Sequence, residues 1–423
     1  MQKKLIAAAV AGLIAVPALA QSNVTISGLV KGGWEHYKLS GGTAATFGHD
    51  AESRVSDQSS RIIFNVLEDL GGGLKAWAQI DSRYANDLGG GTLGSGNTGV
   101  GFMSNWGKFT LGRWDVHYNE FGAIESNRAG SLQTYAAPGI MSQVASVSSL
   151  AGSTGAKAFN RAEVLSTMAG GTRTPNILMW DSPNWNGFTG RLAYSTGYTG
   201  NEGTSNRAVG DASGGSAWTG ALRYNNGPWT AGLSHWRANG ENRATSATAV
   251  VICNPTSGVC TPGPNRAADQ RSTRAWVGYT FAMGLKVGLG WDRSGYDNHI
   301  FGAAKGVGSG NASRSAWMIP VSYTFGPHAI YGTYARAGSA SGSAIAATTG
   351  GDYKATLWTI GYDYAFSKRT SVGVFYTKLN NNLNAAGTAG GAYDLFGLGA
   401  SGATTTRMGE DARQWYLGMA HSF

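Results

Sequence analysis

The stretch LKVGLGWD, residues 285–292, decides the fold of this chain. Its odd-numbered positions carry Leu, Val, Leu and Trp, and its even-numbered positions carry Lys, Gly, Gly and Asp. A period of two with apolar side chains on one face only is typical of a β-strand and does not fit a helix. Residues 229–236 and 358–366 repeat this alternation, with Thr, Gly, Ser or Asp on the polar face. The chain is therefore predicted to be all-β.

Two kinds of connection alternate between such strands. The short ones are Glu68 to Gly73, Asn105 to Lys108, Pro183 to Gly187, Asn225 to Pro228, Ala282 to Gly284, Gly326 to Pro327 and Ser367 to Lys368. The long ones, rich in Gly, Ser and Asn, are Tyr37 to Gln58, Ala85 to Asn97, Asp115 to Arg173, Gly197 to Gly215, Ala238 to Gln270, Ser294 to Arg314, Ala337 to Lys354 and Asn380 to Glu410. These connections predict about sixteen antiparallel strands, the number of a β-barrel wide enough to enclose water.

A soluble β-protein would also alternate, but its apolar faces would meet in a core. Two features favour lipid as the environment of the apolar faces. Aromatic residues lie at strand ends beside the short turns, as an interfacial girdle requires: Trp229, Phe281, Phe325, Phe366 and Phe423. The opposite faces carry small and polar residues, which would fill a core poorly. The sequence therefore predicts a transmembrane barrel.

The composition agrees with this prediction. The 65 glycines, the aromatic content of 11% and the charged content of 13% exclude both an average globular domain and a disordered chain. After residue 20 no apolar run is long enough for a transmembrane helix. A strand protein can lie in lipid only as a closed barrel, because only closure pairs every backbone amide and carbonyl.

The first 20 residues are predicted to be a signal peptide, with residues 21–423 forming one barrel domain. Lys3 and Lys4 precede the apolar run from Leu5 to Val16, and Ala18-Leu19-Ala20 provides a small-x-small cleavage site before Gln21. An anchor helix is the alternative, but the run is shorter than the roughly 20 residues that span a bilayer. Loss of the two signal lysines lowers the formal charge of +9 to +7. Export excludes nucleic acid as the partner of this basic chain and leaves anionic lipid or anionic solutes.

The chain has two cysteines, Cys253 and Cys260, in one Pro-containing loop. An exported protein meets oxidising conditions, so a local disulfide is expected, and half of a metal site is the alternative. The seven histidines show no metal-ligand spacing. No metal or other cofactor is expected.

Strand parity separates the charges from the apolar rows. If Ile62, Phe64 and Val66 face lipid, Arg61 faces the interior, and the same alternation around Ile26 puts Lys31 and Glu35 inside. A charge on the lipid face near the midplane would cost about 2 to 4 kcal/mol. The final residues form an outward row that closes on the first strand: Trp415, Leu417, Met419, His421 and Phe423.

Motifs along the whole length carry a family resemblance. They are Asn23 to Gly28, Ser60 to Phe64, Glu68 to Ala76, Leu111-Gly112-Arg113, Asp181-Ser182-Pro183 with Gly187-Phe188, and the ending Gly-x-x-His-x-Phe at 418–423. Together they resemble the Gram-negative general porins of the beta-proteobacterial type. The resemblance implies a sixteen-stranded, usually homotrimeric barrel in the outer membrane, in contact with lipid and lipopolysaccharide. It also implies that the barrel-assembly machinery recognises the last strand.

In this family the third loop folds inward, and basic wall residues face acidic loop residues. Asn119-Glu120-Phe121-Gly122 resembles the loop motif Pro-Glu-Phe-Gly, with Asn in place of Pro and Ala123 in place of a second Gly. Gly99 occupies a position where many relatives carry an arginine. The expected basic wall is Lys31, Arg61, Lys75, Arg83, Arg113 and Arg173, and the expected acidic groups are Asp81, Asp115, Glu120 and Glu125.

The implied function is passive diffusion of ions and small hydrophilic solutes through a water-filled channel with a modest preference for anions. A substrate-selective porin for sugars or organic acids is the nearer alternative, because Trp77, Trp276 and Tyr331 fall on the inward parity. An outer-membrane enzyme is the more distant one. Residues Gly94 to Gly99 match the Gly-x-Gly-x-x-Gly sequence of dinucleotide-binding sites. They lack the preceding strand and following helix that phosphate binding needs.

Overall fold

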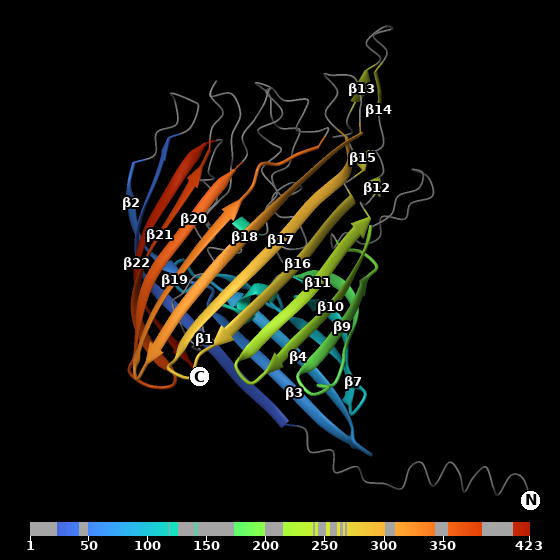
Figure 1. Cartoon of the computed structure of the whole chain (residues 1–423). Helices are drawn as coiled ribbons and strands as arrows, with labels where there is room; N and C mark the ends of the chain where they lie inside the picture. Colours follow the sequence, from blue (N-terminus) through green and yellow to red (C-terminus); the bar gives the residue numbers. More distant parts are fainter. Residues whose placement is uncertain are drawn as a thin grey trace, which may run out of the picture.

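The computed structural model describes residues 23–41, 50–117, 119–125, 140–141, 173–198, 215–239, 242–243, 251–253, 260–262, 265–266, 269–300, 309–342, 354–382 and 409–423. The predicted signal peptide and the proposed start at Gln21 lie outside these residues. The described chain is almost entirely β-structure (Figure 1). None of its helices has the length and apolar character needed to cross a membrane.

Strands account for nearly all the regular structure. They are β1 (Asn23–Gly41), β2 (Glu52–Asp57), β3 (Arg61–Gly71), β4 (Leu74–Tyr84), β5 (Gly91–Thr92), β6 (Thr98–Ser104), β7 (Gly107–Trp114), β8 (Thr174–Asp181), β9 (Phe188–Ser195), β10 (Ser216–Asn226), β11 (Trp229–Asn239), β12 (Asn242–Arg243), β13 (Val251–Cys253), β14 (Cys260–Pro262), β15 (Asn265–Arg266), β16 (Asp269–Thr280), β17 (Leu285–Ile300), β18 (Ser309–Phe325), β19 (His328–Ala337), β20 (Ala355–Ala365), β21 (Thr370–Asn381) and β22 (Glu410–Ser422). The 3₁₀-helix η1 (Glu120–Ala123) follows β7.

The wall is a closed antiparallel sheet. β22 pairs with β1 along their length, from Leu29 opposite Ser422 to Gly41 opposite Glu410. β2 and β3 both pair with β1 and form one interrupted wall strand, and β5 and β6 do the same against β4. Counted in this way, the described residues form sixteen wall strands, as predicted. Two small hairpin ladders, β12 with β15 and β13 with β14, lie outside the wall sheet (Figure 1).

The two faces of the wall differ as the alternation predicts. Outward side chains such as Ile26, Ile360 and Leu417 are more than half exposed. Inward neighbours such as Glu35, Thr359 and Gln414 are buried. A large apolar outer surface is unfavourable in water and suits lipid, because burial of apolar area drives association.

The short connections lie where the sequence predicts them, at one end of the barrel. The β3–β4 turn shows why glycine is needed there: Gly71, Gly72 and Gly73 all have positive φ, which other residues adopt at a cost. The strand ends that lead into the long connections lie at the other end (Figure 1). In outer-membrane barrels the short turns are periplasmic and the long loops extracellular, which sets the orientation.

Aromatic side chains form rows on the outer face of the wall near both ends of the barrel. Beside the short turns, the ring of Tyr279 contacts those of Trp229 and Phe281, and its centroid lies 4.7 Å from each of theirs. Towards the long loops, Tyr376 lies 4.7 Å from Trp415 and 5.1 Å from Trp358. Tyr and Trp prefer the two membrane interfaces, so these rows mark the limits of the hydrocarbon layer.

Candidate functional site

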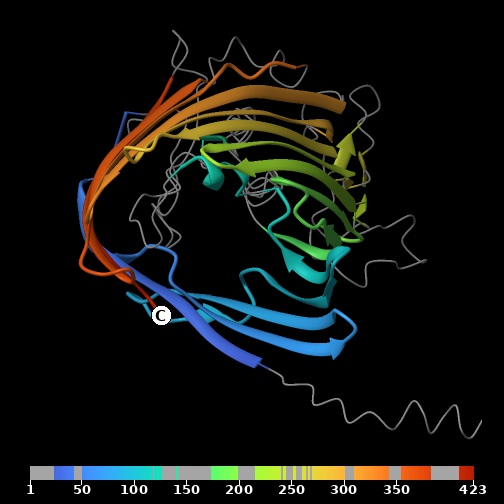
Figure 2. The ribbon, with the colours of Figure 1, turned by 60° about the horizontal axis from the view of Figure 1, so that its bottom comes forward.

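The segment that follows β7 lies against the inner face of the wall. We refer to residues 115–117 and 119–125 as the loop segment; it contains η1. Figure 2 looks into the barrel and shows η1 on the side of β16, β17 and β18, with β1, β3 and β4 on the opposite side. The loop segment is therefore placed to decide how much of the interior stays open.

His117 holds the start of the loop segment. Its ring is buried, with Nδ1 2.7 Å from Ser234 Oγ on β11 and Nε2 2.8 Å from Ser272 Oγ on β16. Burial and the charge of Arg274 hold the pKa of His117 well below its usual range, so the ring is neutral. A neutral imidazole has one donor and one acceptor, and a serine hydroxyl can match either.

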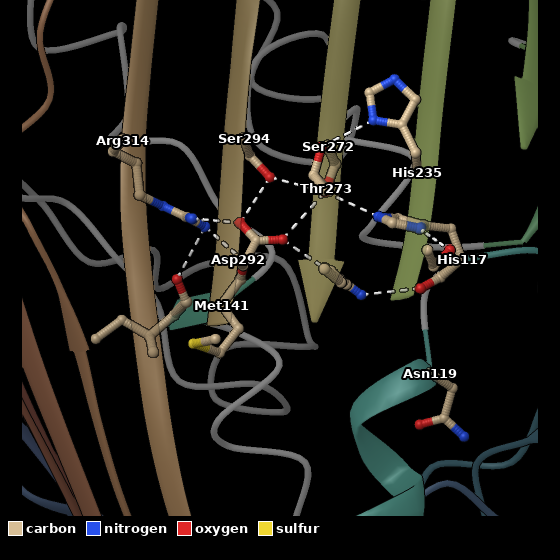
Figure 3. A network of polar contacts seen from close by, with 12 residues as sticks. His117, Asn119, Met141, His235, Ser272, Thr273, Asp292, Ser294 and Arg314 are labelled. Carbon is tan, nitrogen blue, oxygen red and sulfur yellow. Dashed lines mark hydrogen bonds and ion pairs between the residues drawn. The ribbon is translucent and has the colours of Figure 1, made fainter. Parts of the chain in front are cut away.

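A buried group of charges lies beside His117 (Figure 3). Asp292 on β17 pairs with Arg274 on β16, 3.0 Å away, and with Arg314 on β18, and none of the three side chains is exposed. Each arginine also reaches the chain after β7. Arg274 donates to the His117 carbonyl at 3.0 Å, and Arg314 donates to the carbonyls of residues 140 and 141 at 3.1 and 2.6 Å. One carboxylate thus organises two arginines that hold the loop backbone.

Glycines on β16 and β17 form a socket for the loop segment. Gly278, Gly288 and Gly290 face inward, and Phe121 and Ile124 of the loop segment rest on them fully buried. A Cβ at Gly278 would lie 3.0 Å from Ile124 Cγ2, one at Gly288 would lie 2.8 Å from Ile124 Cβ, and one at Gly290 would lie 3.0 Å from Phe121 Cδ1. The absence of these side chains lets η1 lie flat against the wall.

The loop segment meets arginines of the wall through the Glu120 carboxylate and the Asp115 backbone carbonyl. Glu120 forms a two-pronged ion pair with Arg223 on β10, with Nε 2.7 Å from Oε2. The Asp115 carbonyl accepts a bond of 2.8 Å from Arg191 on β9. Burial and the charge of Glu120 raise the pKa of Asp115, while the charges of Arg191 and Arg173 oppose that rise. Arg173 therefore acts on the loop segment, although it precedes β8.

The remaining predicted basic residues lie on the opposite wall. Lys31 on β1, Arg61 on β3, and Lys75 and Arg83 on β4 share the inward parity. Arg83 is neutralised by Asp81, with two contacts of 2.9 Å, and also donates to Ser59. The predicted residues thus fall into two groups, one on β1 to β4 and one around the loop segment.

The place of Arg113 in the basic wall stays a prediction. The strand pairing has a register shift between Gly112 and Trp114, which interrupts the alternation at Arg113, and the Nε of Arg113 is buried. Four basic residues that contact the loop segment were not predicted: Arg191, Arg223, Arg274 and Lys286, whose Nζ lies 2.8 Å from the Ala123 carbonyl. Each lies on the inward row of its strand, so the alternation of the strand alone could have predicted that it faces the interior.

The inward aromatic rings are covered. Lys108 Nζ lies 3.5 Å above the centre of Trp77, and Phe121 packs edge-on against Trp276 at 6.4 Å. Trp77, Trp276 and Tyr331 are 6%, 5% and 2% exposed. Rings this hidden offer a passing solute little surface for stacking.

Glu125 lies at the end of the loop segment and is buried, and its Oε1 has no hydrogen-bond partner among the described residues. Burial raises the pKa of Glu125 to about 8, and the charge of Lys286 acts in the opposite direction. Because this value lies above the ordinary 4.5, the loop conformation binds a proton that an open loop releases. Its stability therefore falls as the pH rises from about 4.5 to about 8.

We expect the current through the purified protein to become noisier as the pH is raised from about 4.5 to about 8, and to change little above that pH. Glu125→Gln keeps the neutral shape and should remove this pH dependence. Single-channel recording at stepped pH measures it. If the wild type and the variant respond to pH in the same way, Glu125 does not control the loop.

Cys253 and Cys260 are opposite each other in the β13–β14 ladder, but their side chains lie outside the described residues, so the disulfide stays a prediction. Among the described side chains, no group of three or more His, Cys, Asp or Glu residues could hold a metal ion.

Comparisons with known proteins agree with this architecture. A sequence profile described as Gram-negative porin matches residues 7–385. An outer membrane porin protein of Bordetella pertussis is 25% identical over 404 residues, which cover 88% of this chain and 92% of that protein.

The fold also matches solved barrels. The anion-selective porin from Comamonas acidovorans has a TM-score of 0.63 at 21% identity, covering 95% of this chain and all of that one. OmpT of Vibrio cholerae, folded in vitro, has a TM-score of 0.57 at 11% identity, covering 96% and 100% of the two chains. At these identities the likeness establishes the fold, and the profile match establishes the family. The chain belongs to the Gram-negative porins and is a channel protein of the bacterial outer membrane.

Proposed function

We propose that this chain is a general diffusion porin that passes ions and small hydrophilic solutes with a modest preference for anions. The observation that carries the proposal is the inner wall: a closed barrel whose inward row is small, polar and charged, with the loop segment lying along one side. Such an interior holds water and selects mainly by size and charge.

The preference for anions rests on the balance of inward charges. The acidic residues Asp81, Asp181, Glu120 and Asp292 are each neutralised by at least one arginine. Lys75 and Lys108 form no ion pair with the described part of the chain. An ion in the lumen passes within about a Debye length of these lysines, roughly 8 Å, so they are incompletely screened. The similar solved porin from Comamonas acidovorans is named as anion-selective, which supports a preference for anions over cations in this chain.

Replacing Lys75 and Lys108 by Gln should lower the anion-to-cation permeability ratio. One charge about 8 Å away in water changes an ion's energy by about 0.5 kcal/mol, roughly twofold per lysine. Reversal potentials in a salt gradient measure the ratio. The matched control is Lys38→Gln with Lys378→Gln, which removes two lysines from the outward row. An equal shift of the reversal potential in both double variants would contradict the assignment of Lys75 and Lys108 as the residues that favour anions.

The rival function is substrate selectivity, which needs a site for a particular solute. The covered aromatic rings favour general diffusion instead. Liposome swelling with sugars and organic acids of graded size tests the two. Rates that depend on size and charge alone support general diffusion, and a solute that enters much faster than others of its size contradicts it.

Four further assignments complete the proposal. The protein carries out no catalysis. Residues 1–20 direct export and are removed. Three copies assemble in a membrane of lipid and lipopolysaccharide. The outward row from Trp415 to Phe423 is the signal read by the barrel-assembly machinery; its last residue bonds back to β1, with Phe423 N 3.2 Å from the Gly28 carbonyl.

A further inference from the structure

The indole ring of Trp77 reaches from β4 to β7 across the inner face of the wall. It passes Gly101 on β6, the residue opposite Trp77, where an added Cβ would lie 3.2 Å from the indole Nε1. The Nε1–H donates to the Phe109 carbonyl on β7 at 3.1 Å. A buried indole N–H usually has such a partner. The glycine and the hydrogen bond together hold the ring in one orientation.

This orientation places the face of the Trp77 ring against the ammonium group of Lys108. Lys108 Nζ lies 3.5 Å from the centre of the Trp77 ring and 4.9 Å from the centre of the Trp114 ring. The two indoles meet edge to face, with centroids 5.7 Å apart. A cation within about 6 Å of an aromatic centroid is attracted to the ring face, and Trp attracts it most strongly. We call Trp77 and Trp114 the lysine seat.

Asp181 competes with the lysine seat for the Lys108 ammonium. The two residues are directly opposite in the pairing of β7 with β8, where opposite charges attract. The Asp181 carboxylate is instead engaged by Arg191 on β9, with contacts of 2.6 and 3.2 Å. No hydrogen bond or ion pair within the described part of the chain involves the Lys108 ammonium. Since Lys108 is partly exposed, its N–H groups are available to water and ions in the lumen.

We propose that Trp77 is a positioning residue for the anion preference of the channel. By holding the Lys108 ammonium against its ring, it keeps a positive charge at the edge of the lumen. Without the ring, the ammonium would turn towards Asp181 and lie against the wall, farther from the path of a passing ion, and its effect on that ion falls with distance. The inference deepens the proposed function, on which it rests, by naming the residue that fixes where the charge lies.

A double-mutant cycle between Trp77 and Lys108 tests this role. The four proteins are wild type, Trp77→Leu, Lys108→Gln and the double variant, and the reversal potential of each is measured in a potassium chloride gradient across a planar bilayer. Lys108→Gln should lower the anion-to-cation permeability ratio roughly twofold. Trp77→Leu should cause about half or more of that change, although it removes no charge. In the Lys108→Gln background it should have no further effect, because coupled residues are not additive.

Two further variants separate the role of the ring face from a loss of packing. Trp77→Phe retains an aromatic face and should keep more of the wild-type ratio than Trp77→Leu. Trp291→Leu removes an exposed indole from the outer face of β17 and should match wild type. Additive effects of Trp77→Leu and Lys108→Gln, or a wild-type ratio in Trp77→Leu, would overturn the inference. If Trp77→Leu yields no folded protein, Trp114→Leu takes its place in the cycle, with a smaller shift of the same sign expected.

Failure of the proposed function and failure of the lysine seat give different results. The sign of the wild-type reversal potential tests the anion preference, whereas the differences among the four proteins test the lysine seat. A wild type that favours cations would contradict the proposed preference, yet Lys108→Gln and Trp77→Leu should still shift the potential in the same direction. An unchanged potential in Lys108→Gln would overturn the inference whatever the sign in wild type.

Discussion

Replacing Asp292 by Asn should free the loop segment from the wall, so that single-channel conductance rises and the current flickers. Asp292 is the carboxylate shared by Arg274 and Arg314, and all three side chains are fully buried. Removing one partner of a buried ion pair leaves uncompensated charge and costs about 3 to 5 kcal/mol. Here two arginines lose their partner at once. They are expected to move apart and to give up the loop carbonyls that they hold.

The control is Asp297→Asn on the same strand. Asp297 also pairs with an arginine, but that pair is partly exposed on the outer face, where salt bridges contribute about 0 to 1 kcal/mol. We expect wild-type conductance and noise for this variant. Wild-type behaviour of Asp292→Asn would show that the buried charges do not hold the loop.

Gly288→Val should have the opposite effect and narrow the channel. A side chain at this inward position would start 2.8 Å from Ile124 Cβ and 2.9 Å from Pro320 Cγ. The wall is fixed by backbone pairing on both sides, so the loop segment must give way towards the lumen. Overpacking of this kind usually costs about 1 to 3 kcal/mol, and Val suits a strand, so the barrel is expected to fold.

Gly220→Val is the matched control. Gly220 faces outward on β10, and the nearest atoms to an added Cβ are 4.0 Å away, so a side chain there has room. Conductance and the size limit in liposome swelling should fall for Gly288→Val and stay unchanged for Gly220→Val. An unchanged size limit in Gly288→Val would show that the socket does not set the position of the loop.

The wall of this porin could be predicted from the sequence because strand alternation and turn formation depend on residues that are close together in the chain. A period of two fixes which side chains face lipid, and the short turns carry their own signals in Gly, Pro and Asn. Those rules give the strand number, the closure of the last strand on the first, and the inward parity of Lys31, Arg61 and Asp81.

The loop contacts could not be predicted in the same way. Glu120 and Arg223 are separated by 103 residues, and His117 and Ser272 by 155. Their meeting depends on strand stagger and on the path of the loop through the interior, and neither is encoded in a local pattern. The triad around Asp292 depends further on two arginines of neighbouring strands turning towards one carboxylate, which parity permits but does not require.

If the barrel encloses a passive, water-filled path beside the loop segment, single-channel recording of the purified protein in a planar bilayer will detect it. We expect discrete ohmic current steps whose conductance rises in proportion to the conductivity of the salt solution, and a reversal potential in a salt gradient whose sign shows that anions permeate better than cations. Absence of steps, or a conductance that saturates as salt is raised, would contradict it.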